Sequence, residues 1–140
     1  MVCLTRITAL ALLLLVAGCV TFTTPAMLRA KGAAIHGRSD LAYQDAYRHV
    51  EKQMRSCFER GFWSTMPPLD ISGDIYTDTG RAEVRGEYGG GVQGYKVIVD
   101  ISEAGDHSQV DIWTSDTSQW KRVGKSALAW SRGDDTGCGV

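Results

Sequence analysis

Basic residues are not in excess in this sequence. Its 140 residues contain 15 Lys and Arg against 16 Asp and Glu, a formal net charge of −1. Proteins that bind nucleic acid usually carry a basic excess, because the phosphates must be neutralised. The charge balance therefore argues against nucleic acid as a partner, and it provides no polybasic segment for holding the chain on an anionic membrane.

Familiar catalytic motifs are also missing. The sequence has no Gly-x-Ser-x-Gly elbow, no His-Glu-x-x-His pair and no phosphate-binding loop with a lysine. Its three histidines, His36, His49 and His107, lack the spacing that metal ligands need. The sequence therefore predicts no catalytic site, no metal and no other cofactor. An enzyme would need a pocket that gathers carboxylates, or His49, with perturbed pKa values.

Two short motifs resemble catalytic ones without their structural context. Residues 89–94 match Gly-x-Gly-x-x-Gly, but a predicted strand follows them where a dinucleotide site needs a helix. Asp-Thr-Gly, the loop of aspartic proteases, occurs at 78–80 and 135–137, yet only three residues follow the second copy. We interpret all three segments as turns, in which Asp, Thr and Gly are favoured.

The sequence has no apolar run long enough to span a membrane. Its N-terminal run, from Ile7 to Val16, is much shorter than the roughly 20 residues of a transmembrane helix. The run follows the basic residue Arg6, an order typical of an export signal peptide. We therefore expect residues 1–18 to be a signal peptide that is removed.

The signal ends in Leu15, Val16, Ala17 and Gly18, and Cys19 follows directly. This segment resembles the lipobox of bacterial lipoproteins, the class that signal peptidase II processes. The resemblance covers only the first 19 residues. It implies that Cys19 is lipidated with acyl chains such as palmitate, whose buried methylenes contribute about 0.8 kcal/mol each. It also implies a membrane-anchored protein of the bacterial envelope that faces the periplasm. In this class an Asp directly after the lipidated cysteine favours retention in the inner membrane. Val20 occupies that position here, so the resemblance implies the outer membrane.

Cysteine is scarce, with four residues in the chain. Cys3 leaves with the signal and Cys19 carries the lipid, so Cys57 and Cys138 remain. In an oxidising compartment such a pair is expected to form a disulfide. It would close a loop of about 80 residues and stabilise the fold by on the order of 4.5 kcal/mol in the chain-entropy model. The alternative, a catalytic thiol at Cys57, has no nucleophile signature around it.

The mature chain is long enough for one domain. Residues 19–39 contain the lipidated cysteine and then Thr, Ala, Gly and scattered basic residues, a composition typical of a flexible tether. Fully extended, this tether could reach about 65 Å. A short helix over Pro25–Lys31 is compatible with it. The folded domain is expected over residues 40–140.

Hydrophobic periodicity predicts the fold of that domain. Apolar residues recur at spacings of three and four from Asp40 to Gly61 and from Thr117 to Gly133, which predicts two amphipathic helices, the first capped by Asp or Ser. Between them lie four alternating runs, 69–75, 82–88, 95–101 and 110–113. Their short, turn-rich connections indicate an antiparallel meander. The expected fold is a two-layer α+β domain: helix, four-stranded meander, helix, with both helices on one face.

Two tryptophans mark a possible partner surface. Trp113 is predicted on the polar face of its strand, and Trp63 lies in an irregular segment before two prolines. Either could be an exposed anchor, since tryptophan is enriched at binding hot spots. Packing within the domain is the alternative for both, whereas Trp120 and Trp130 fall on the predicted core stripe.

The expected function is that of a non-enzymatic envelope lipoprotein, a binding or structural accessory module. Its domain would bind an unidentified envelope component, most simply a protein, through the polar sheet face around Trp113 or through an edge strand. The alternative is a carrier of a lipid or small ligand in a groove between helix and sheet. A continuous apolar cavity behind Tyr95, Val97 and Val99 would favour that alternative.

Overall fold

The computed structural model describes residues 24–60, 67–89 and 94–138. Three helices and five strands form within them, which confirms the predicted α+β class. Along the chain they are α2 (Pro25–Lys31), β1 (Ala33–Ser39), α3 (Tyr43–Phe58), β2 (Leu69–Tyr76), β3 (Arg81–Tyr88), β4 (Tyr95–Ala104), β5 (His107–Thr114) and α4 (Ser118–Ser131).

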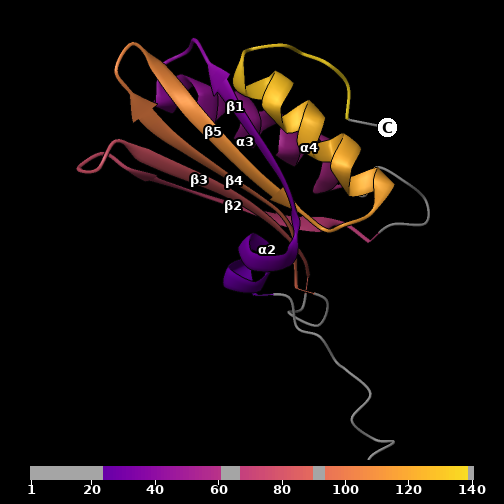
Figure 1. Ribbon diagram of the computed structural model, residues 1–140. Helices are drawn as coiled ribbons and strands as arrows, with labels where there is room; N and C mark the ends of the chain where they lie inside the picture. Colours follow the sequence, from indigo (N-terminus) through magenta and orange to yellow (C-terminus); the bar gives the residue numbers. More distant parts are fainter. Residues whose placement is uncertain (1–23, 61–66, 90–93, 139–140) are drawn as a thin grey trace, which may run out of the picture.

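The sheet is antiparallel throughout, in the order β1-β5-β4-β3-β2. Its last four strands form the predicted meander, and β1 adds to the outer side of β5 (Figure 1). Strand β5 is therefore an interior strand, and β1 and β2 are the two edges.

The prediction of four strands and of a tether extending to Ser39 is wrong. Residues Ala33 to Ser39 pair with β5, from Ala33 opposite Thr114 to Ser39 opposite Ser108. The alternation of this strand is hard to recognise because Ile35 is the only large apolar residue on its inner face, beside Ala33, Gly37 and Ser39. A Cβ added to Gly37 would lie 2.4 Å from the side chain of Leu128 on α4, so a larger residue there would require that side chain to move.

Helix α3 begins two residues later than the predicted cap implies. Its N-cap is Ala42, whose side chain makes no capping hydrogen bond. The expected cap residues serve elsewhere: Asp40 pairs with Arg38, and the buried Ser39 hydroxyl donates a 2.6 Å hydrogen bond to the carbonyl oxygen of Ser131. These polar residues thus fix the end of β1 rather than the start of the helix.

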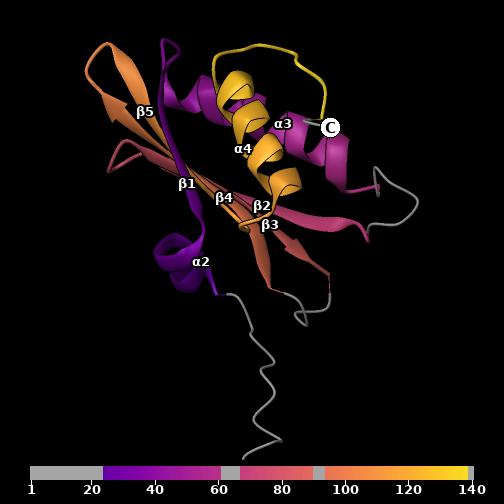
Figure 2. The ribbon, with the colours of Figure 1, turned by 45° about the vertical axis from the view of Figure 1, so that its right-hand side comes forward.

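The two long helices cover one face of the sheet and lie side by side there (Figure 2). The predicted arrangement of two helices on a single face is corrected by a third helix, α2, which packs against the sheet as well. Each long helix contributes one apolar side to a common core with the inner side chains of the strands. The largest fully buried side chains are Trp130 and Met54, one from each helix. Close packing of this core, rather than helix propensity, stabilises the two layers.

Tyr47 lies in this core and makes the free energy of unfolding depend on pH. Burial raises the pKa of Tyr47 to about 12, and the hydrogen bond to the Glu51 side chain acts in the same direction. Since the unfolded value is about 10, the contribution to stability is complete below pH 10 and is lost as the pH rises through about 12. Tyr47→Phe is therefore expected to lessen the fall in unfolding free energy between these pH values, measured by urea denaturation. The exposed Tyr76→Phe is the control, and an equal fall in both variants would contradict the assignment.

The third helix, α2, packs on the opposite face, against β4 and β5. Its ends have the expected residues: the Thr24 hydroxyl accepts a hydrogen bond from the N–H of Met27, and the N–H of Gly32 donates to the carbonyl of Leu28. Leu28 is buried, and so is Ile98 on the same face of β4. Burying such a side chain contributes about 1.5–3 kcal/mol, so α2 is part of the folded unit.

Gly32 allows α2 to approach the sheet. A Cβ at this position would lie 2.5 Å from the carbonyl oxygen of Leu28 and 2.7 Å from that of Thr114. Both are backbone atoms and cannot move aside easily, so Gly32→Ala is expected to displace α2. Trypsin should then cleave at Arg29 and Lys31 about tenfold faster, which corresponds to a loss of ~1.4 kcal/mol of local stability. Gly137→Ala, where an added Cβ meets nothing within 4 Å, is the matched control. Equal cleavage rates would show that α2 does not depend on this close approach.

The predicted disulfide between Cys57 and Cys138 is present, with a Cα–Cα distance of 5.5 Å. It joins the last turn of α3 to the segment that follows α4. Nearby, the indole N–H of Trp130 donates a 2.6 Å hydrogen bond to the carbonyl of Thr136. The C-terminal segment is thus fixed to the helical layer at two points.

Candidate functional site: the polar face of the sheet

The face of the sheet that α3 and α4 leave uncovered is lined by charged and aromatic side chains. They alternate along the strands with the buried residues of the core, because successive side chains of a strand point to opposite faces. From β1 to β2 this face carries His36, Asp111, Trp113, Asp100, Glu83, Arg85, Asp74 and Tyr76.

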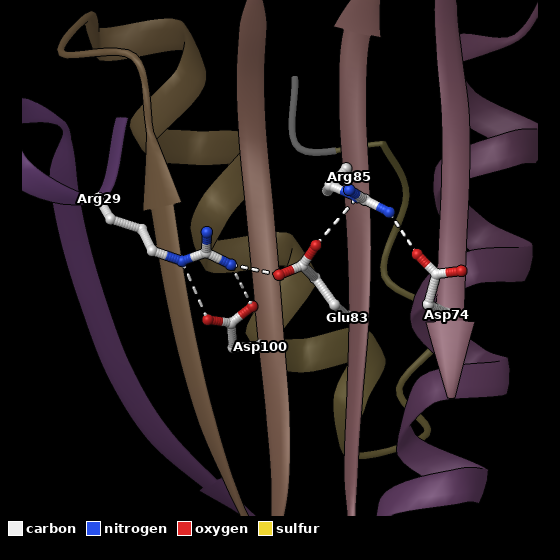
Figure 3. A network of polar contacts seen from close by, with 5 residues as sticks. All are labelled: Arg29, Asp74, Glu83, Arg85 and Asp100. Atoms are coloured by element: carbon white, nitrogen blue, oxygen red, sulfur yellow. Dashed lines mark hydrogen bonds and ion pairs between the residues drawn. The ribbon is translucent and has the colours of Figure 1, made fainter. Parts of the chain in front are cut away.

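Five of the residues near this face form one chain of ion pairs (Figure 3). Arg29, from α2, donates two hydrogen bonds to Asp100, from Nε at 3.2 Å and from Nη2 at 2.9 Å, and also contacts Glu83. Arg85 continues the chain by pairing with Glu83 and with Asp74. We call these residues the charge chain; it links α2 to β4, β3 and β2.

The charge chain is partly shielded from solvent, which strengthens its electrostatic interactions. The side chains of Glu83 and Asp100 are each 18% exposed, and that of Arg29 is 31% exposed. The hydrogen bond to Asp100 raises the pKa of Arg29 and outweighs the opposing effect of burial. Arg85 is held less well: its buried Nε lies 2.9 Å from a Glu83 oxygen but donates no hydrogen bond.

A hollow of about 260 Å³ lies beside the charge chain, at the end of the face near the β2–β3 turn. Its lining consists of Tyr76, Thr79, Arg81, Ala82, Glu83 and Asp100. Tyr76 is 47% exposed, and with Ile75 it is one of two large hydrophobic side chains exposed in the described part of the chain. Since Glu83 and Asp100 are both paired with Arg29, the hollow offers an aromatic surface and polar contacts rather than a free acid or base.

Trp113 is engaged within the molecule more than its predicted role as an anchor implies. The guanidinium carbon of Arg29 lies 5.5 Å from the centre of the Trp113 ring, a cation–π contact. On another side the His36 ring meets it edge-on at 6.4 Å, and His36 Nδ1 lies 2.7 Å from an oxygen of Asp111. Trp113 is half-buried, and these contacts connect it to α2 and to β1.

Several predicted functional residues cannot be placed on this surface. Trp63, the lipidation residue Cys19 and the lipobox residues Leu15 to Gly18 lie outside the described residues. Within the described ranges, no group of three or more His, Cys, Asp or Glu side chains is arranged to hold a metal ion. No helix in these ranges is long and apolar enough to cross a membrane.

The interpretation of the first Asp-Thr-Gly motif as a turn is confirmed, whereas the second lies in the irregular segment after α4 and not in a turn. The first copy forms the β2–β3 turn, with Gly80 at φ 61°. In the second copy, Asp135 accepts a 2.7 Å hydrogen bond from the side-chain amide of Gln53 on α3. Each motif thus has a local structural role.

Sequence reasoning missed the charge chain because Arg29 was assigned to the tether. The possible helix over Pro25–Lys31 was the available signal, since a docked helix would bring its central arginine onto the acidic sheet face. Comparison of the chain with models of protein families, with curated proteins and with solved structures finds no match, so the functional interpretation rests on the residues themselves.

Proposed function

We propose that the protein is a lipid-anchored module of the bacterial envelope, on the periplasmic side of the outer membrane, that binds another envelope protein through the polar face of its sheet. The lipobox-like segment ending at Cys19 supports the anchor. The Cys57–Cys138 disulfide is compatible with an exported protein, because structural disulfides persist in oxidising compartments.

The exposed Tyr76 beside the hollow is the observation that carries the binding proposal. Tyrosine is enriched at hot spots because it adds a large contact area and a polar hydroxyl at low entropic cost. A hollow of about 260 Å³ is slightly below the roughly 300–1,000 Å³ of sites for drug-sized ligands. It therefore suits one or two side chains of a protein partner.

The alternative of a ligand groove between helix and sheet has less support. Val97 and Val99, behind which such a groove would lie, are fully buried in the common core. The same region is packed by side chains of α3 and α4. A carrier would have to separate these layers before it could admit a ligand.

Site-specific photo-cross-linking in living cells tests the binding proposal. A cross-linker in place of Tyr76 is expected to give one adduct of defined mass, and one in place of Lys125, exposed on α4, is not. Tyr76→Ala should reduce co-purification of the same partner about 30-fold, the effect of losing ~2 kcal/mol at a hot spot. Equal adducts at both positions, or none at Tyr76, would contradict binding through this face.

A further inference from the structure

The folded part of the chain begins close to the proposed lipid anchor. Thr24, the N-cap of α2, is only five residues after Cys19. Five residues span at most about 18 Å when fully extended. The predicted tether of residues 19–39 would have reached about 65 Å, so the packing of α2 and β1 removes most of that reach.

Helix α2 cannot lengthen this connection without losing specific contacts. Arg29 would have to leave Asp100 and Glu83, and Leu28 would have to be exposed. Gly32 places the end of the helix directly beside the carbonyl of Thr114 in β5. The point of attachment is therefore a fixed feature of one end of the sheet.

We propose that the α2 end of the domain lies against the lipid headgroups and that the β2–β3 and β4–β5 turns face away from the membrane. This inference rests on the proposed anchor at Cys19. The ten-residue strand β4 runs from the α2 end to the distant turn, a length of about 33 Å. The short connection to Cys19 would hold the α2 end near the membrane. The length of the sheet would keep the two turns away from it.

Charge at the two ends favours the same orientation. At the α2 end, Lys31 and Lys96 are balanced by Asp70 and Glu87, where β2 starts and β3 ends. The distant end carries three carboxylates in or beside the two turns, Asp78, Glu103 and Asp106, against Arg81, and is therefore the more acidic of the two. Anionic lipids attract lysine by about 1 kcal/mol for each residue near the surface, and they repel carboxylates.

This orientation gives the polar face its access to a partner. Tyr76 and Thr79 belong to the distant end, where β2 turns into β3. The hollow that they line would project into the periplasm instead of facing lipid. The charge chain, which includes Arg29, would connect the membrane-proximal helix to that hollow.

Spin labels on the lipidated full chain in vesicles test the orientation. Cys57 and Cys138 are in a disulfide and Cys19 would be acylated, so a single cysteine can be added by Ala30→Cys on α2 or, as the matched variant, by Asp106→Cys in the β4–β5 turn. Vesicles of phosphatidylethanolamine and phosphatidylglycerol carry a nickel-chelating lipid that relaxes nearby labels. We expect relaxation at Ala30 to be several-fold stronger than at Asp106.

Mass spectrometry of the N-terminal peptide separates the two proposals. An acylated Cys19 together with equal relaxation at the two labels, or stronger relaxation at Asp106, overturns the orientation and leaves the anchor intact. An unacylated Cys19 overturns both the anchor and the orientation that depends on it. Adding Lys31→Glu to the Ala30→Cys variant should weaken its relaxation, whereas adding Arg81→Glu, at the distant end, should not.

Discussion

Replacing Cys57 and Cys138 together with alanine is expected to lower the free energy of unfolding by about 4.5 kcal/mol. The disulfide closes a loop with a sequence separation of 81 residues, and a cross-link of that length removes a corresponding entropy from the unfolded chain. For a domain of this size the midpoint of thermal unfolding should fall by roughly 15 °C. Calorimetry on the oxidised protein and on the double variant measures the shift.

Reduction of the native protein provides the control for this substitution. A phosphine reductant should lower the unfolding midpoint of the native protein to nearly that of the double variant and should leave the variant unchanged. An unaltered midpoint in native protein whose thiols are shown to be free would refute the stabilising role. During thermal unfolding of the double variant, the Trp130 side chain should become exposed to solvent before the rest of the core. The reason is that Thr136, whose carbonyl accepts its hydrogen bond, lies between α4 and Cys138.

The elements that the sequence predicted are those whose own side chains carry a strong pattern. In α3, residues such as Ala46, Val50 and Met54 recur at helical spacing and are all fully buried. Strands β3 and β4 alternate apolar and charged residues because only one face of each meets the helical core. In these segments the residues that form the local hydrophobic pattern are the same ones that pack in the core, so the pattern alone predicts the structure.

Strand β1 was missed because its pairing depends on its neighbour. Ala33, Gly37 and Ser39 contribute little apolar surface, but β5 offers them a complete row of backbone partners. Ile35 is the one large apolar residue on this inner face, and at Gly37 a small residue leaves room for the Leu128 side chain of α4. Such a strand is determined by long-range hydrogen bonding, which composition does not reveal.

The candidate site was only partly predictable for a related reason. Alternation placed Trp113 on the polar face correctly, but it could not show that Arg29 would lie beside its ring. The residue that stands out on this face, Tyr76, ends a strand and carries no motif. Its exposure follows from its position on the face that α3 and α4 leave uncovered, at the end of the sheet away from α2, a property of the assembled fold.

Substitution of Arg29 by methionine is expected to cost about 2 kcal/mol of stability, since it leaves the partly shielded carboxylates of Asp100 and Glu83 without their common partner. Residual solvent contact keeps this value below the cost of breaking a fully buried pair. The loss should concentrate in α2, which would lose its polar contacts with the sheet. Urea denaturation measures the global change, and hydrogen exchange at the amide groups of α2 measures the local one.

Arg48→Met is the matched control, because the Arg48–Asp45 pair is largely exposed, at 70% and 55%, and should contribute less than about 0.5 kcal/mol. If both substitutions have equal effects, the charge chain does not stabilise α2. A double-mutant cycle with Asp100→Asn separates pairing from the loss of a side chain: the two changes together should cost less than the sum of each alone. Strict additivity would mean that Arg29 acts through packing on Trp113 instead. In that case α2 would be held by its apolar contacts, and the polar face would be free to exchange its ion pairs with a partner.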